Sequence, residues 1–249
     1  MRWVALAVTL LLCGPAVAAR VVSLNLCTDE YLALLAPEQV AGLTPLARDP
    51  SLSVVAEQAA RLPTVRADAE AVLRLHPDLV LAAPYGAQTT LTLLKQRGLR
   101  MDVADLPTDF DGIRRTTRHF AALLGVPARG ETLLAAMDAT LRAIPARPPR
   151  DALFLEPRGW TAAAGSLAHA VMSAAGLRDQ GNGRLVGLEM LATHPPALLV
   201  TPESSGFPSL ATDLLRHPAL AAIPRVTVPP ALIACAGPWS AQAAAILAR

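Results

Sequence analysis

The feature that most constrains this fold is a short unit that the chain makes twice. Residues 69–84 (AEAVLRLHPDLVLAAP) and residues 188–203 (LEMLATHPPALLVTPE) each read as a short helix, a proline and an apolar strand. Glu70 and Glu189 hold the same place in the two copies. Identity within the unit is low, because only the glutamate, the proline and one leucine coincide. Its occurrence in both halves of the chain nevertheless predicts two related lobes.

On both sides of the middle of the chain, short apolar runs alternate with helical stretches. The strand-like runs of the first half are RVVSLN (20–25), DLVLAA (78–83) and RMDVAD (100–105), and those of the second half are DALFLEP (151–157), ALLVTP (197–202) and RVTVPPALI (225–233). Strands and helices that alternate in this way indicate βαβ units and a mostly parallel sheet. A length of 249 residues suits two lobes of about 100–120 residues each.

This rhythm breaks once, at two successive helical stretches with no strand between them. FDGIRRTTRHFAALLG (110–125) is followed by VPARGETLLAAMDATLRAIP (126–145). In the second stretch an apolar residue recurs at helical spacing from Leu133 to Ile144. A helix of this length measures about 26 Å, which is the width of a small domain.

The predicted architecture is α/β, with two βα lobes whose sheets are mostly parallel. The lobes are expected at residues 19–125 and 148–249, and a single long α-helix at 126–147 is expected to join them. Pro127 suits the first turn of this helix, and Pro145 is placed to end it.

The first 18 residues are predicted to be a secretory signal peptide. Arg2 supplies a positive start, an apolar core of about ten residues follows, and the small-residue pattern AVA ends at Ala18, where cleavage is expected. The apolar core is too short to span a membrane, which takes about 20 residues. A lipid anchor on Cys13 is disfavoured, because Leu12 stands where such signals carry a small residue. The protein is therefore expected to be exported across the inner membrane.

Two cysteines remain after removal of the signal peptide. Cys27 and Cys235 are an even number in an oxidising compartment, so one disulfide is allowed, and two free buried thiols are the alternative. The formal net charge of +2 gives no sign of a nucleic-acid partner.

The usual signatures of enzymes are missing from the sequence. It contains no G-x-S-x-G elbow, no P-loop, no G-x-G-x-x-G and no H-E-x-x-H. Ser166 and His169 lie three residues apart, but a serine that caps a helix explains this better than catalysis. The histidines are scattered, so no metal site is predicted. The alternatives are an exported α/β hydrolase built around Ser166 or Ser204, and a zinc receptor that uses His169.

Bulky and charged side chains follow several predicted strands. Tyr85 comes after the strand at 78–83, Arg158 and Trp160 come after the strand at 151–157, and Trp239 follows the last strand. In parallel sheets, ligands gather beyond the carboxyl ends of the strands. These residues therefore predict a cleft between the lobes for a flat or bulky ligand. The alternative is that the two tryptophans merely fill the interface between the lobes.

The sequence resembles one known family along nearly all of its mature length. RVVSLN…TDEYLALLAPEQVAGLTPLARDP, AEAVLRLHPDLVLAAPYG, LLKQRGLRMDVAD, GSLAHAVMSAAGL and HPALAAIPRVTVPPALIACAGPWSAQA are similar to the helical-backbone periplasmic substrate-binding proteins of ABC importers. That family carries vitamin B12, haem and ferric siderophores. The resemblance implies two βα lobes on one long helix, a monomer without catalysis or resident cofactor, and an ABC permease with its ATPase as partners.

The resemblance also assigns a role to the repeated glutamate. In the family, a surface glutamate of each lobe docks onto arginines of the permease, and the matching residues here are Glu70 and Glu189. Two exposed carboxylates on separate lobes would orient a basic partner. The alternative is that both merely complement the positive end of a helix.

The resemblance implies that the ligand is a metal chelate held between the lobes. We expect an iron complex, either a ferric siderophore met by arginine or haem, and cobalamin packed on aromatic side chains is the alternative. A bridge between Cys27 and Cys235 would tie one lobe to the other near this cleft. The candidate ligand-binding residues are Asn25, Cys27, Arg48, Tyr85, Arg158, Trp160, Ser204 and Trp239.

Overall fold

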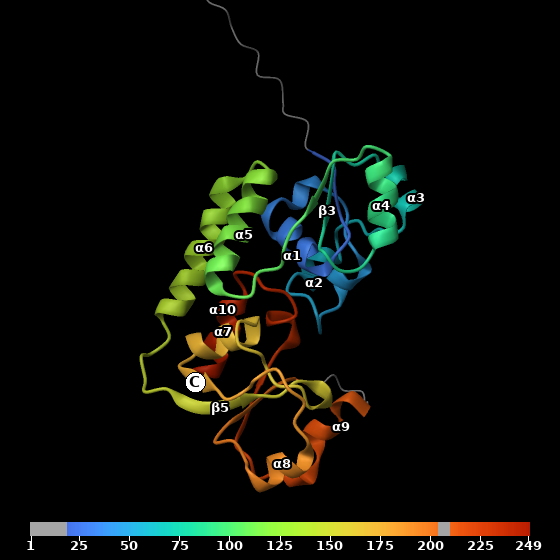
Figure 1. Cartoon of the computed structure of the whole chain (residues 1–249). Coiled ribbons are helices and arrows are strands. Elements are labelled where there is room, and N and C mark those ends of the chain that lie inside the picture. The colour runs from blue at the N-terminus through green and yellow to red at the C-terminus, as the bar shows by residue number, and fades with distance from the viewer. Residues whose placement is uncertain (1–18, 204–209) are drawn as a thin grey trace, which may run out of the picture.

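The computed structural model describes residues 19–203 and 210–249, and Figure 1 shows two lobes, each built around its own sheet. The predicted signal peptide, with its cleavage after Ala18, and Ser204 lie outside the described residues. All strand pairs are parallel, and the strand orders are β2-β1-β3-β4 and β6-β5-β7-β8. The predicted α/β fold with parallel sheets is therefore confirmed.

The strands are short and the helices vary widely in length. The first sheet contains β1 (Val21–Ser23), β2 (Val40–Gly42), β3 (Leu79–Ala82) and β4 (Met101–Val103), and the second contains β5 (Arg150–Phe154), β6 (Leu177–Asp179), β7 (Leu199–Pro202) and β8 (Arg225–Val228). The α-helices are α1 (Leu26–Leu35), α2 (Ala56–Ala59), α3 (Ala69–Arg74), α4 (Gln88–Gln96), α5 (Phe110–Leu123), α6 (Pro127–Arg142), α7 (Leu167–Ala174), α8 (Leu188–Thr193), α9 (Leu210–Arg216) and α10 (Ser240–Leu247). Within these described residues, no helix is long and apolar enough to cross a bilayer.

Each sheet is covered on both faces because its strands are apolar on both sides. Successive side chains of a strand point to opposite faces. In the N-terminal lobe, Leu79 and Leu81 pack in the core that contains α1 and α5, whereas Val80 packs in the core that contains α3 and α4. In the C-terminal lobe, Phe154 lies in the core with α7 and α10, whereas Leu153 lies in the core with α8 and α9. The two lobes are thus built on one plan.

The repeated sequence unit occupies equivalent places in the two lobes. Glu70 is the second residue of α3, which leads into β3, and Glu189 is the second residue of α8, which leads into β7. β3 and β7 both hold the third place in their strand orders. The internal relation that the repeat predicts is therefore confirmed by the topology.

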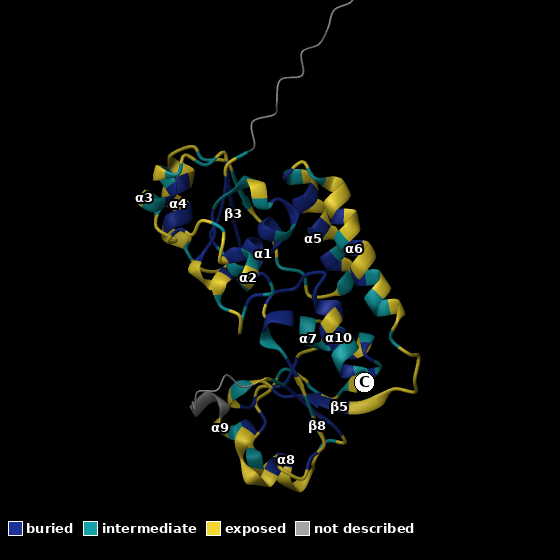
Figure 2. Ribbon diagram, turned by 180° about the vertical axis from the view of Figure 1, so that it is seen from behind, coloured by how far each residue is buried: buried dark blue, intermediate teal, exposed yellow. Residues whose placement is uncertain are grey.

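Helix α6 runs without interruption from Pro127 to Arg142, packs on α5 of the first lobe, and reaches α10 of the second. Figure 2 shows its buried side facing the protein and its exposed side facing solvent. The helix ends before the predicted limit of 147, because proline has no amide hydrogen and disfavours helical backbone in the residue before it. The segment from Pro145 to the start of β5 at Arg150 is not helical.

The C-terminal lobe also sends a loop into the first lobe. Cys235 forms a disulfide with Cys27 of α1, with 5.1 Å between their Cα atoms, so of the two alternatives for these cysteines the structure has the bridge. The hydroxyl of Tyr31 donates to the carbonyl of Ala236 at 3.2 Å. The ring of Trp239 packs on that of Tyr31, with 5.3 Å between the ring centres. The two lobes are therefore fastened at α6 and again at this loop.

Candidate functional site

A cavity of about 640 Å³ lies between the two lobes. The loop after β2 forms one wall of the cavity. The other wall is formed by the ends of β5 and β7, the segments that follow β5, β7 and β8, and the start of α7. The lining residues are Pro50, Ser51, Leu52, Phe154, Glu156, Pro157, Ser166, Leu167, Ala168, Pro202, Glu203, Pro229, Pro230, Ala231, Ile233 and Ala234. The carboxyl edges of the two sheets therefore face one another across this cavity, as expected for a ligand site in parallel sheets.

Two buried carboxyl groups hold the loop that contributes the N-terminal wall. Asp29 accepts hydrogen bonds from the backbone nitrogen of Thr44 at 3.1 and 3.2 Å and from the hydroxyl of Thr44. The neighbouring Glu30 accepts from the backbone nitrogen of Val54 at 2.9 Å. Both ends of the segment 44–54 are thus anchored to α1, and the cavity residues 50–52 lie between these anchors.

Burial perturbs the acidity of both anchors. Loss of solvation raises the pKa of Asp29 to about 7 and that of Glu30 to about 8, although their hydrogen bonds oppose the change. Oε2 of Glu30 is buried without a hydrogen-bond partner, which further favours a protonated carboxyl. The sequence analysis missed this pair. The available signal was two consecutive acidic residues inside the apolar helix LCTDEYLALL.

Three of the predicted ligand residues have structural roles instead. Trp239 is only 5% exposed and lies in the core between the lobes, which matches the alternative of an interface filler. Cys27 is buried and bonded to Cys235, which leaves it no free thiol. The guanidinium of Arg48 donates to the carbonyls of Ala59 and Leu62 and thereby holds the chain around α2.

The remaining described candidates lie at the facing edges of the lobes. Tyr85 follows β3 and is 72% exposed, and Trp160 follows β5 and is 48% exposed. Arg158 is exposed on the 3₁₀ helix η3 (Pro157–Gly159), where its backbone is left-handed, with φ at 67°. Asn25 uses its side chain to cap α1 by accepting from the backbone nitrogen of Cys27. None of these four side chains is part of the cavity lining.

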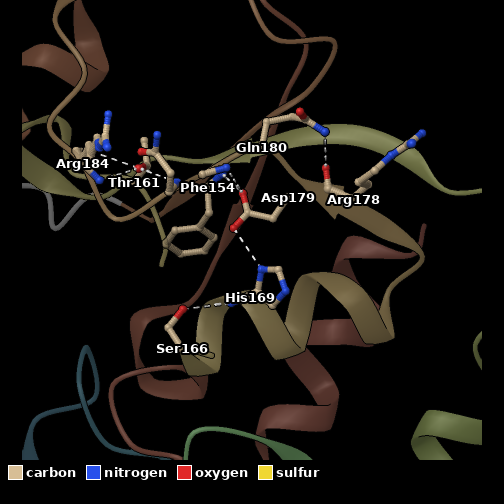
Figure 3. Close-up of polar contacts among 10 residues, drawn as sticks. Phe154, Thr161, Ser166, His169, Arg178, Asp179, Gln180 and Arg184 are labelled. Carbon is tan, nitrogen blue, oxygen red and sulfur yellow. Dashed lines mark hydrogen bonds and ion pairs between the residues drawn. The ribbon is translucent and has the colours of Figure 1, made fainter. Parts of the chain in front are cut away.

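Ser166 and His169 do not form a nucleophile and base (Figure 3). The Ser166 hydroxyl accepts from the backbone nitrogen of His169 at 3.2 Å, which is the predicted helix cap. The imidazole turns instead to Asp179, with 3.6 Å between Nδ1 and the carboxylate. Asp179 also accepts from the backbone nitrogens of Phe154 and Gly181, so it ties β6 to β5 and to the following turn. The geometry at Ser166 therefore gives no support to a hydrolase.

The described residues contain no cluster of three or more histidine, cysteine or acidic side chains suited to a metal ion. The cavity lining is mostly apolar, and its polar side chains are two serines and two glutamates. Such a lining can enclose a bulky ligand whose metal is already bound by the ligand's own donor atoms.

The sequence matches the protein family described as periplasmic binding protein over residues 21–226. The chain belongs to this family. Solved structures with the same fold include the periplasmic haem-binding protein RhuT from Roseiflexus sp. RS-1, at 24% identity and a TM-score of 0.71, where the alignment covers 93% of this chain and 97% of that one. A periplasmic haem-binding protein from Pseudomonas aeruginosa matches at 23% identity and a TM-score of 0.71, with 92% and 91% covered. Among curated proteins, none matches this sequence.

In this periplasmic binding protein, the two repeated glutamates are both accessible. Glu70 is exposed and pairs with Arg74 of the same helix at 2.7 Å, and Glu189 is exposed on α8. Figures 1 and 2 place α3 and α8 far apart, one on each lobe. The distance between them suits a partner large enough to contact both lobes at once.

Proposed function

We propose that this protein is the periplasmic solute receptor of an ABC importer, and that it carries an iron complex, either haem or a ferric siderophore. The observation that supports this best is the 640 Å³ cavity between two firmly joined lobes in a periplasmic binding protein. Clefts of this size and apolar character suit ligands of the mass of a metal chelate. The haem-binding proteins of the same fold support an iron-containing cargo.

The exposed aromatic side chains support a flat ligand. Tyr85 and Trp160 belong to the facing edges of the two lobes and offer large ring surfaces to solvent. Aromatic surfaces bind planar macrocycles through dispersion and apolar burial, and a tyrosine hydroxyl can also ligate iron. The protein itself performs no chemical step in this proposal, and it is expected to act as a monomer.

A second candidate is cobalamin, and the composition of the cavity favours it. The described lining contains Glu156 and Glu203 but no lysine, arginine or histidine. Carboxylates repel the carboxylates of haem and of many siderophores, whereas the amide side chains of a corrinoid can donate hydrogen bonds to them.

The decisive experiment is titration of the mature chain with haem, cyanocobalamin and a panel of ferric siderophores. Binding can be followed by the visible spectrum of each chelate and by the fluorescence of Trp160 and Trp239. We expect one chelate to saturate the protein at one equivalent. Absence of saturable binding across the whole panel would refute the proposal.

A further inference from the structure

Two glutamates that follow neighbouring strands line the cavity. β5 and β7 are parallel partners, with Leu153 opposite Leu199 and Phe154 opposite Val200. Beyond these pairs, the chains continue to Glu156 and Glu203, and both residues line the cavity and are exposed to it. Both glutamates therefore belong to the wall of the cleft that the C-terminal lobe forms.

Within residues 19–203 and 210–249, no side chain neutralises either carboxylate. Among the described residues, no ion pair and no side-chain hydrogen bond involves Glu156 or Glu203, and the lining contains no basic side chain. Arg48 is turned to backbone carbonyls, and the exposed Arg158 does not line the cavity. The sequence of residues 204–209, SSGFPS, adds no charge.

The position of Glu156 is unfavourable for an unpaired charge. Partial burial raises its pKa, because the carboxylate has lost part of its hydration. A carboxylate that lines the cavity without a partner leaves its hydrogen-bond acceptors free for whatever enters the cavity. A ligand that brings N–H donors or positive charge would restore the lost interactions, whereas a ligand with its own carboxylate would add repulsion.

We propose that Glu156 and Glu203 are specificity-determining residues, and that they select a chelate that presents a cationic group or a cluster of N–H donors to the wall of the C-terminal lobe. They act against chelates that present carboxylates there. This inference rests on the proposed function, because it concerns the ligand of the same cleft. In this proposal, the wall of the C-terminal lobe recognises the sign of the charge at the periphery of the ligand and does not recognise the metal.

The test uses chelates that differ only in peripheral charge. Ferrioxamine B ends in an ammonium group, its N-acetyl derivative is neutral there, and its N-succinyl derivative ends in a carboxylate, while the iron centre stays the same. Two further series are cyanocobalamin with its monocarboxylic acid, and haem with its neutral dimethyl ester. In each series that binds, we expect the less negative member to bind about tenfold more tightly.

The variants Glu156→Gln and Glu203→Gln, alone and combined, remove the charge and keep the shape. The double variant is expected to bind the members of a series with nearly equal affinity, and added salt should reduce the discrimination of the wild type. Glu57→Gln on α2 is the matched control, because Glu57 is exposed and lies outside the cavity lining. It should leave the discrimination unchanged.

The outcomes separate this inference from the proposed function. Three outcomes would overturn the inference and leave the receptor function standing. In the first, the protein binds all members of a series with equal affinity. In the second, the double variant still discriminates between them, and in the third, the carboxylate member binds more tightly. Failure of every chelate to bind overturns the proposed function, and the inference with it.

Discussion

Asp29 and Glu30 are consecutive carboxylic acids that are completely buried, and together they anchor both ends of the loop that forms one cleft wall. The groups that face them are the hydroxyls of Ser23, Thr44 and Ser53 and backbone amides, and Asp29 adds its own charge to the environment of Glu30. No basic side chain is among these causes. The fold therefore favours their protonated forms far more than an unfolded chain does.

The raised pKa values predict how stability depends on pH. Between about pH 4, where unfolded carboxyls titrate, and about pH 7–8, the folded protein holds protons that the unfolded chain has released. The stabilisation is complete at low pH and is lost as the pH rises through the folded pKa values. We expect the free energy of unfolding, measured with urea, to fall by several kcal/mol, on the order of 5 kcal/mol, from pH 5 to pH 8.

The double variant Asp29→Asn with Glu30→Gln cannot ionise at these positions. Its free energy of unfolding should therefore change much less between pH 5 and pH 8. Glu57→Gln, which alters an exposed carboxyl on α2, should keep the slope of the wild type. A double variant with an undiminished slope would show that other groups control the pH dependence.

At the scale of the elements, the contact between α5 and α6 depends on one glycine. A Cβ atom at Gly130 would lie 2.5 Å from the Cβ of Ala121, so the two helices approach too closely for any side chain there. Glycine lowers helix stability by about 1 kcal/mol, so its presence inside α6 has a cost that close packing offsets.

We predict that Gly130→Ser destabilises the protein by about 1–3 kcal/mol, although serine is the better helix former. The control is Gly187→Ser, because a Cβ at this helix cap of α8 meets nothing within 4 Å. Serine is a good cap, so the control should be neutral or stabilising. Thermal unfolding of both variants checks the prediction, and equal melting temperatures would contradict it.

The elements that the sequence predicts well are those with local signals. The long helix carries a proline at its start, a proline beyond its end and an apolar stripe between, and the strands are short apolar runs. The roles of Asp29 and Trp239 depend instead on partners far along the chain, namely Thr44 and Tyr31. Residue type alone suggested a ligand-binding indole for Trp239 and no role for Asp29. Only the folded chain shows that both are buried.

On the scale of the whole molecule, the disulfide joins residues separated by 208 positions and closes most of the described chain into one loop. A cross-link between such distant residues restricts the unfolded chain strongly. The same bridge connects α1 of the first lobe to the last loop of the second, next to the Tyr31–Trp239 contact. It therefore stabilises both the fold and the relative position of the two walls of the cleft.

We predict that Cys27→Ala with Cys235→Ala loses about 2–5 kcal/mol of stability in urea unfolding. A reducing agent should lower the stability of the wild type to a similar value and should leave the double variant unchanged. If complete reduction of the disulfide left the urea midpoint of the wild-type protein unchanged, the bridge would not stabilise the fold.

The repeat that predicts two related lobes also places one exposed glutamate on each, and we propose that these meet the permease. The pair between Glu70 and Arg74 is exposed, and such pairs contribute about 0–1 kcal/mol, so an arginine of a partner can replace it at little cost. Two charges on widely separated helices fix the orientation of a large partner better than two charges on one lobe.

Replacement of both Glu70 and Glu189 by alanine should therefore abolish uptake of the chelate while leaving its affinity for the isolated protein unchanged. Each single variant should reduce uptake by about tenfold, because half of the contact remains. Uptake by proteoliposomes that contain the permease and its ATPase, together with a parallel binding titration, distinguishes the two effects. The control variant Glu57→Ala removes an exposed carboxylate elsewhere on the first lobe and should support normal uptake.

If the double variant instead lost affinity for the chelate, the glutamates would belong to the ligand site or to its folding. If uptake were unaffected, the repeated carboxylate would serve only the ends of its two helices.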